Sequence, residues 1–146
     1  MKVKSIFLAD DDFDDIELFQ EALEEVCNSC TLVSSKDGID LLNKLSGPAA
    51  NLPQVMFIDV NMPLMNGLEC LEQIKRQDSL KNIPVVILTT SASPTTIERA
   101  YSLGANLFVE KPFEFHQLKT MIGKVMKMDW SNYASPEIEG FVYKAS

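Results

Sequence analysis

Five short apolar runs recur along the first 110 residues, and most of them are rich in Val, Ile, Leu or Phe. They cover residues 3–9, 31–34, 54–58, 84–89 and 105–110. Runs of this length and composition are typical of β-strands buried on both faces.

The segments between and after these runs place apolar residues every three or four positions. In residues 14–26, for example, Ile16, Phe19 and Leu23 follow this spacing. Such spacing predicts amphipathic helices. The predicted helices cover residues 14–26, 37–45, 64–76, 95–103 and 116–126.

Regular alternation of strands and helices predicts an α/β fold with right-handed crossovers, in which helices cover both faces of a parallel, doubly wound five-stranded sheet. The carboxyl ends of parallel strands meet in one crevice. Asp10 and Asp11 follow the first strand, Asp59 follows the third, Thr89 ends the fourth and Lys111 follows the fifth. We expect these five side chains to meet there.

This group of residues favours phosphoryl chemistry. Carboxylates about 4 Å apart repel by roughly 4 kcal/mol, so Asp10, Asp11 and Asp59 need a cation. Mg²⁺ suits oxygen ligands, Mn²⁺ is an alternative, and the main-chain carbonyl of Asn61 is a further candidate ligand. The Asp59 carboxylate can attack phosphorus as a nucleophile, with Lys111 and the Thr89 hydroxyl stabilising the phosphoryl oxygens.

Size and charge narrow the function further. A chain of 146 residues suits a single domain, and a net charge of −8 disfavours direct nucleic-acid binding. No apolar run approaches the roughly 20 residues that span a bilayer, and residues 1–7 lack the order of a signal peptide. We therefore expect a cytoplasmic protein without membrane insertion.

Three cysteines support neither a disulfide framework nor a four-ligand zinc site. Cys27 and Cys30 form a C-x-x-C pair, but they close a predicted helix, whereas a thioredoxin-type redox pair opens one. We expect reduced thiols at all three positions, including Cys70.

Four motifs together resemble the receiver domain family of response regulators. They are Phe7-Leu-Ala-Asp-Asp-Asp, Ile58-Asp-Val-Asn-Met-Pro followed by Asn66-Gly67, Val85-Val-Ile-Leu with Thr89, and Gly104-Ala-Asn-Leu-Phe-Val-Glu-Lys-Pro-Phe. The resemblance covers about 125 residues. It includes single-domain regulators that are paired with bacterial phytochrome kinases.

The resemblance implies a flavodoxin-like fold with strand order 2-1-3-4-5. It also implies that Asp59 is the phosphoacceptor, that Asp10 and Asp11 are the acidic metal pair, and that Lys111 is the invariant lysine. Thr89 corresponds to the switch hydroxyl and Phe108 to the switch aromatic, where many relatives have Tyr. The Lys111–Pro112 peptide bond is typically cis in the family.

The resemblance further implies a single-domain response regulator in a two-component phosphorelay, with a sensor histidine kinase or phosphotransfer protein as phosphodonor. Such a protein is a phosphoacceptor rather than an enzyme. Residues 1–128 correspond to the receiver domain, and residues 129–146 form a C-terminal extension: a tail, a flap or a dimer arm. Trp130 and Tyr133 indicate either packing or an interface, and a homodimer is possible by analogy.

Three other functions stay open. An aspartyl phosphohydrolase would need a second Asp where Asn61 stands. A receiver-like module could signal without phosphate, although all five pocket positions are filled. A flavin-binding domain would need a phosphate loop after the first strand, where three acidic residues stand instead.

The neighbouring acidic residues have a simpler explanation. Asp12, Asp14 and Asp15 open a predicted helix, where carboxylates cap the free amides and interact favourably with the helix dipole. Ser91 corresponds by family analogy to a position that tunes hydrolysis of the acyl phosphate.

Overall fold

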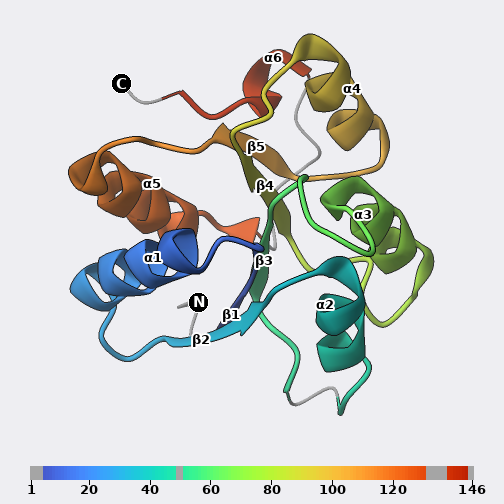
Figure 1. Cartoon of the computed structure of the whole chain (residues 1–146), viewed down its shortest axis with the longest axis horizontal. Coiled ribbons are helices and arrows are strands. Elements are labelled where there is room, and N and C mark those ends of the chain that lie inside the picture. The colour runs from blue at the N-terminus through green and yellow to red at the C-terminus, as the bar shows by residue number, and fades with distance from the viewer. Residues whose placement is uncertain (1–4, 49–50, 131–137, 145–146) are drawn as a thin grey trace.

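The computed structural model describes residues 5–48, 51–130 and 138–144. Its five strands form one parallel sheet in the order β2-β1-β3-β4-β5 (Figure 1). This confirms the predicted doubly wound sheet and its strand order. The strands are β1 (Ser5–Ala9), β2 (Thr31–Ser35), β3 (Val55–Ile58), β4 (Val85–Thr89) and β5 (Leu107–Glu110).

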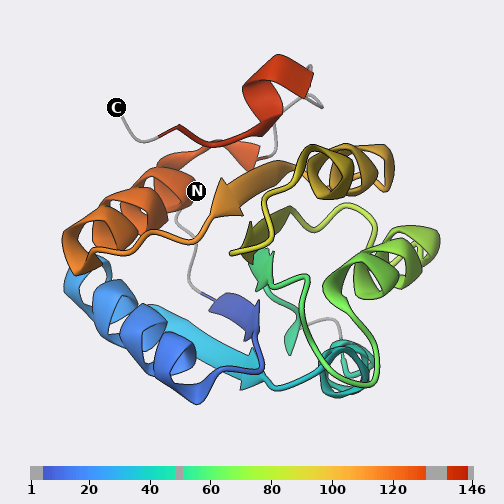
Figure 2. The ribbon, with the colours of Figure 1, turned by 45° about the horizontal axis from the view of Figure 1, so that its top comes forward.

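Helices cover both faces of the sheet, as Figure 2 shows from a second direction. The five predicted helices are α1 (Phe13–Val26), α2 (Gly38–Leu45), α3 (Gly67–Arg76), α4 (Pro94–Ser102) and α5 (Phe115–Lys127). Alternate strand residues face two separate apolar clusters. One cluster packs under α1 and α5, and the other packs under α2, α3 and α4.

Helix α3 begins at Gly67 rather than at residue 64 as predicted. The Asn66 side chain accepts from the Glu69 amide, and the Glu69 carboxylate accepts from the Asn66 amide, which together form a capping box. Leu64 has φ of 67°, a left-handed conformation that cannot continue a helix. The cap therefore outweighs the apolar periodicity at this end.

A sixth helix, α6 (Ile138–Phe141), lies in the C-terminal extension and was not predicted. Phe141 is fully buried and belongs to the apolar cluster under α2, α3 and α4. The Trp130 indole N–H donates to the Val125 carbonyl at 3.1 Å. Tyr133 lies outside the described residues, and the boundary between residues 1–128 and 129–146 stays a prediction.

Two local predictions are wrong. Cys27 and Cys30 form a disulfide rather than two thiols, because a tight turn after α1 brings their Cα atoms to 5.6 Å. Among the described residues no peptide bond is cis, so the Lys111–Pro112 bond is trans. Cys70 is a free, buried thiol, and burial raises its pKa to about 12.

Within the part of the chain that the structure describes, no helix has both the length and the apolar character needed to cross a bilayer.

Candidate functional site

The strand order brings the predicted carboxylates together. Asp10 follows β1 and Asp59 follows β3, and these strands are neighbours in which Ala9 pairs with Ile58. The Asp59 amide donates to the Ala9 carbonyl at 2.9 Å, which fixes the two strand ends against each other. Asp10 and Asp59 are only 2% and 5% exposed, so both carboxylates are largely shielded from water.

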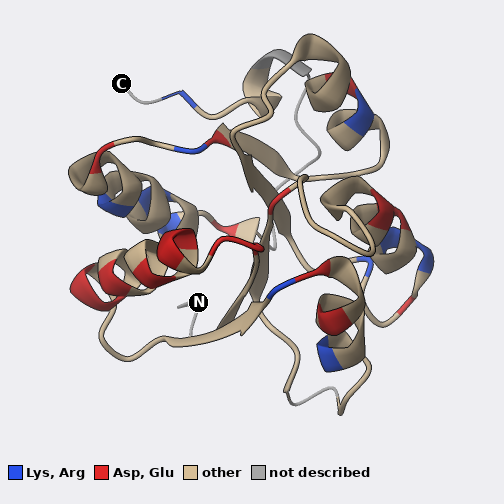
Figure 3. Ribbon diagram, viewed as in Figure 1, with Lys and Arg blue, Asp and Glu red and all other residues tan. Residues whose placement is uncertain are grey.

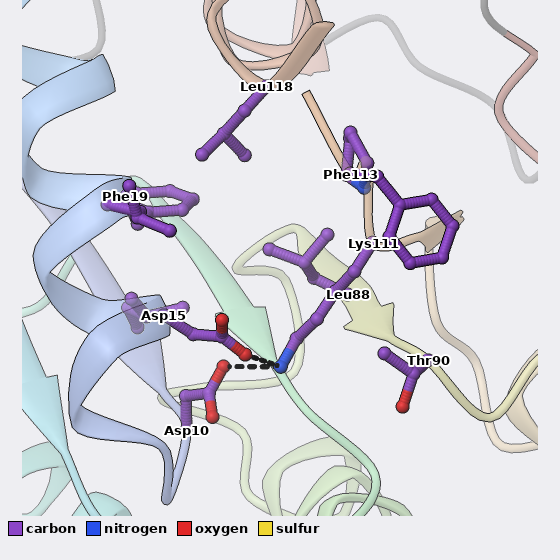
Figure 4. Close-up of a pocket in the computed structure, with 11 residues that line it drawn as sticks. Asp10, Asp15, Phe19, Leu88, Thr90, Lys111, Phe113 and Leu118 are labelled. Atoms are coloured by element: carbon purple, nitrogen blue, oxygen red, sulfur yellow. Dashed lines mark hydrogen bonds and ion pairs between the residues drawn. The ribbon is translucent and has the colours of Figure 1, made fainter. Parts of the chain in front are cut away.

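Lys111 reaches this acidic cluster from the end of β5. Its Nζ lies 2.8 Å from a carboxylate oxygen of Asp10 and 2.8 Å from one of Asp59. A third carboxylate, that of Asp15, lies 2.7 Å from the same nitrogen. Figure 4 shows the Lys111 side chain extended towards Asp10 and Asp15. One mostly buried ammonium group therefore forms ion pairs with three acidic side chains.

Asp15 is a site residue that the sequence interpretation missed. Asp12 caps α1 as expected, accepting from the amides of Asp14 and Asp15. The prediction that Asp15 only supports the start of the helix is nevertheless wrong, because its side chain pairs with Lys111. The signal was available: Asp15 lies four residues before Phe19, on the helix face that turns towards the sheet.

The acidic cluster also has the geometry of a cation site. Asp10, Asp11 and Asp59 can each offer one oxygen, and these three atoms lie within 4.8 Å of one another. Carboxylate oxygens are the ligands that Mg²⁺ and Mn²⁺ prefer. Asp11 is exposed and Asp59 is buried, so such an ion would lie at the boundary between solvent and the sheet. The role of the Asn61 carbonyl as a ligand stays a prediction.

Hydrogen bonds join the loop after β3, which contains Asn61, to the end of β4 and the loop that follows it. The Asn61 amide donates to Asp59 Oδ1 at 3.2 Å, and its side-chain amide donates to the Ser91 hydroxyl at 2.5 Å. The Thr89 side chain is fully buried, and its hydroxyl accepts from the Ser91 amide at 3.2 Å. Ser91 therefore contacts both candidate site residues.

Residues 6–123 match the model of the response regulator receiver domain. The chain belongs to this family. The probable methanogenesis regulatory protein FilR2 of Methanothrix harundinacea is 36% identical over 107 residues, which cover 72% of this chain and 69% of FilR2. Response regulator Rcp1 of Synechocystis sp. is 32% identical over 123 residues, covering 82% of this chain and 84% of Rcp1.

Solved structures agree with this assignment. The phosphorylated cyanobacterial phytochrome response regulator RcpA matches with a TM-score of 0.77 and 33% identity, over 90% of this chain and 96% of RcpA. The Mn²⁺-bound form of Rcp1 matches with a TM-score of 0.76 and 30% identity, over 92% of this chain and 99% of Rcp1. The receiver domain therefore accounts for most of the chain.

The electrostatics of this receiver domain follow from burial and from the lysine. Burial raises the pKa of Asp10 above its ordinary value, and contact with Lys111 only partly offsets this rise. For Lys111, burial acts to lower the pKa, but hydrogen bonds to Asp10, Asp15 and Asp59 outweigh it and raise the value. Lys111 thus stays charged, while keeping the buried Asp10 side chain ionised costs free energy.

Phe108 lies on β5 and faces the apolar cluster under α2, α3 and α4, away from Lys111. Its side chain is fully buried, and its ring centroid lies 6.1 Å from that of Phe141. The predicted switch aromatic is therefore covered by the C-terminal extension.

A small apolar cavity of about 190 Å³ adjoins the acidic cluster. Its walls come from α1, from β4 and from the segment that follows β5 (Figure 4). Beside Asp10 and Lys111 the lining includes Leu18, Leu88 and Phe113. Phe113 is 95% exposed, an unusual position for so large an apolar side chain.

Replacing Asp10 with Asn should stabilise the metal-free receiver domain at neutral pH, because burial disfavours the ionised wild-type side chain. Asn keeps the acceptor for the Asp12 amide. Because the folded-state pKa of Asp10 is raised, protonation stabilises the wild type at low pH, and this stability is lost as pH rises through that pKa. The advantage of Asp10→Asn should therefore vanish in acid.

Urea unfolding in EDTA from neutral to acid pH measures this difference. Asp78→Asn is the matched control, because the Asp78 side chain is 95% exposed and lies outside the acidic cluster. The Asn variant should also lose the stabilisation that Mg²⁺ gives the wild type. A lower midpoint for Asp10→Asn in EDTA at neutral pH would contradict the assigned cost of burying this charge.

Proposed function

We propose that this chain is a single-domain response regulator that takes a phosphoryl group onto Asp59 from a sensor histidine kinase or a phosphotransfer protein. The observation that carries the proposal is the position of Asp59, which is nearly buried between the Asp10 carboxylate, the Lys111 ammonium group and a candidate cation site. RcpA, which is similar over most of the chain, has been crystallised in a phosphorylated form.

In the proposed reaction a carboxylate oxygen of Asp59 attacks phosphorus. A P–O bond forms, the P–N bond of the phosphohistidine breaks, and the imidazole leaves with the electron pair of that bond. Lys111 exchanges part of its contact with the carboxylates for a phosphoryl oxygen, and the Thr89 hydroxyl donates to another. Asp10, Asp11 and Asp59 would hold Mg²⁺, or Mn²⁺ as an alternative, which would supply further positive charge.

The proposed output is a population shift. Drawing the Thr89 hydroxyl towards the phosphoryl group changes the end of β4, which pairs with β5 through Thr89 and Glu110. Phe108 lies on β5, so we expect the packing of its side chain to change when the end of β4 changes. The surface around α4 and β5 then binds a protein partner or a second copy of the chain.

We further propose that the chain is a phosphoacceptor and not an enzyme with a separate substrate. An aspartyl phosphohydrolase of this kind needs an acid–base Asp two residues after its nucleophile, and here Asn61 stands at that position and its side chain donates to Ser91. We also propose a cytoplasmic protein. Its charge pattern disfavours direct contact with nucleic acid. Figure 3 shows acidic residues along α1 and in the loop after β1, a face that repels phosphate backbones.

Intact mass after incubation with acetyl phosphate and Mg²⁺ tests the proposal. We expect wild type to gain one phosphoryl group, and we expect no gain for Asp59→Asn or for wild type in EDTA. The Asn variant keeps the size of the side chain while it removes the nucleophile. A wild type that stays unmodified in Mg²⁺, or an Asn variant that gains the same mass, would sink the assignment of Asp59.

The apolar cavity beside the acidic cluster suits the protein that donates the phosphoryl group. Leu18 and Phe113 line it, and both are exposed at the rim of the site. Leu18→Asp should slow phosphotransfer from a phosphorylated histidine phosphotransfer domain about tenfold, which corresponds to roughly 1.4 kcal/mol of lost contact. Phosphorylation by acetyl phosphate should not change, because this small donor does not need the cavity.

Rapid-quench measurement of the two reactions separates docking from chemistry. Ile39→Asp is the matched control: Ile39 is 41% exposed on α2, Leu18 is 45% exposed on α1, and only Leu18 lines the cavity. Equal slowing with both donors would show instead that Leu18→Asp disturbs the acidic cluster itself.

A further inference from the structure

We infer that residues 138–143, here called the C-terminal flap, act as a phosphorylation-sensitive cover of β5: docked in the unphosphorylated protein and released when Asp59 is phosphorylated. The inference rests on the proposed function, because it takes phosphorylation of Asp59 as the input. It adds a defined output element, which is a segment of the chain itself.

The flap is attached to β5 by one aromatic side chain and by main-chain pairing. The Phe141 ring lies 5.2 Å from the Tyr101 ring in an edge-on arrangement and 6.1 Å from the Phe108 ring. The Tyr143 amide donates to the Phe108 carbonyl at 2.8 Å, and Val142 forms a parallel bridge with Phe108. Both kinds of contact converge on Phe108.

The flap lies along the outer edge of the sheet. Strand β5 ends the strand order, so its outer edge has main-chain groups available for pairing. Figures 1 and 2 both place the segment that contains α6 beside β5 and α4. The flap therefore covers the surface through which a change in β5 would reach a partner.

The docked state is poised to open. Helix α6 has only four residues, too few to hold a helix without tertiary contacts. The Tyr143 hydroxyl is buried without a hydrogen-bond partner, which costs free energy in the docked state and is relieved when the flap leaves. Val142 and Tyr143 pack against the two apolar clusters from partly buried positions, and Lys124 Nζ lies 5.7 Å from the centroid of the Tyr143 ring. A short segment with one fully buried side chain and one unsatisfied hydroxyl belongs to the low-stability end of a fold.

The site and the flap are joined through one strand. Lys111 follows β5 directly, its amide donates to the Thr89 carbonyl at 2.9 Å, and its ammonium group balances the acidic cluster. A phosphoryl group on Asp59 changes the partners of Lys111 and Thr89 together. Phe108, three residues earlier on β5, lies between β4 on one side and the flap on the other.

The two contacts of Phe108 differ in strength. Strand β4 is held between β3 and β5 and is buried at every residue, so it has little freedom to adjust. The flap is held less firmly than β4, so a shift of β5 should break the contacts with the flap before it breaks the pairing with β4. Because linkage is reciprocal, phosphorylation that weakens docking also means that docking opposes phosphorylation.

Amide hydrogen exchange at Tyr143 measures docking directly, because this N–H is bonded to Phe108. We expect exchange at Tyr143 to become at least tenfold faster when acetyl phosphate and Mg²⁺ phosphorylate the full chain. We expect no change for Asp59→Asn under the same conditions. Thr89→Ala should gain the phosphoryl group more slowly, because it lacks one donor to a phosphoryl oxygen, and once phosphorylated it should keep its Tyr143 amide protected.

Variants of the flap test the contacts without phosphate. Phe141→Ala should remove protection at Tyr143, whereas Phe13→Ala, at a residue 68% exposed, should not. Phe141→Leu keeps the buried position apolar and should give an intermediate effect. Protected amides in α3 show that each variant is folded. Tyr143→Phe, which removes the unsatisfied hydroxyl, should slow exchange at position 143.

The outcomes separate the two proposals. Failure of the wild type to gain mass overturns the proposed function and this inference together. A full mass gain with unchanged exchange at Tyr143 overturns only the inference. Unchanged protection in Phe141→Ala also overturns it, because the flap would then be held by something other than the aromatic anchor.

Discussion

Replacing Lys111 with Gln is expected to lower the free energy of unfolding by roughly 3 kcal/mol in metal-free buffer, the low end for breaking a buried ion pair. The Lys111 side chain is 14% exposed and its Nζ lies within 2.8 Å of oxygens from Asp10, Asp15 and Asp59. Without this charge, the buried carboxylates of Asp10 and Asp59 face each other unbalanced.

Mg²⁺ should restore part of the stability of Lys111→Gln, because a cation at the acidic cluster replaces the missing charge. Phosphorylation by acetyl phosphate should still slow at least tenfold, since one of the positive charges that stabilise the transferring group is lost. Urea unfolding with EDTA or Mg²⁺ and the rate of mass gain measure the two effects.

Lys119→Gln is the matched control for Lys111→Gln. Lys119 forms an ion pair with Glu25, whose side chain is 55% exposed, and its Nζ lies 5.5 Å from the centroid of the Phe115 ring. This change should therefore cost between 0 and about 1 kcal/mol. Equal costs for the two variants in EDTA would contradict the central role of Lys111 in balancing the acidic cluster.

Replacing Gly67 with Ala is expected to destabilise the protein by roughly 3 kcal/mol and to slow phosphorylation more than tenfold. A Cβ at this position would lie 2.1 Å from the Asp59 carbonyl oxygen and 2.8 Å from its carbon. Both atoms are main-chain atoms of the proposed phosphoacceptor, so the backbone must shift. The first residue of α3 therefore sets the position of Asp59.

Gly123→Ala provides the opposite control for Gly67→Ala. Gly123 lies inside α5 and nothing lies within 4 Å of a Cβ built there, so alanine should stabilise the helix by about 0.5–1 kcal/mol. Thermal unfolding of both variants, with intact-mass kinetics, checks the pair. A Gly67→Ala variant with wild-type stability and rate would refute the packing argument.

The sequence alone was sufficient for the architecture. Apolar runs alternating with amphipathic segments predicted a parallel sheet covered on both faces, because burial periodicity is a local property that each segment carries by itself. The polar residues that follow the strands predicted where Asp10, Asp59 and Lys111 would meet, because parallel strands end at the same edge of a sheet.

Local pattern was insufficient where capping or turn geometry competes with apolar spacing. The apolar residues before Gly67 suggested a longer α3, but the Asn66 capping box and the left-handed Leu64 set its start. Cys27 and Cys30 are three positions apart, and only the turn after α1 shows that they can be joined.

Only the tertiary structure decided the contacts between distant segments. The Asp15 side chain meets Lys111 because α1 packs beside the end of β5, 96 positions later in the chain. The burial of Phe141 depends on Tyr101 and Phe108. The sequence around Phe141 therefore could not indicate which residues it contacts. Sequence periodicity encodes which face of an element is buried, whereas the docking of one element on another depends on side chains that meet only in the folded chain.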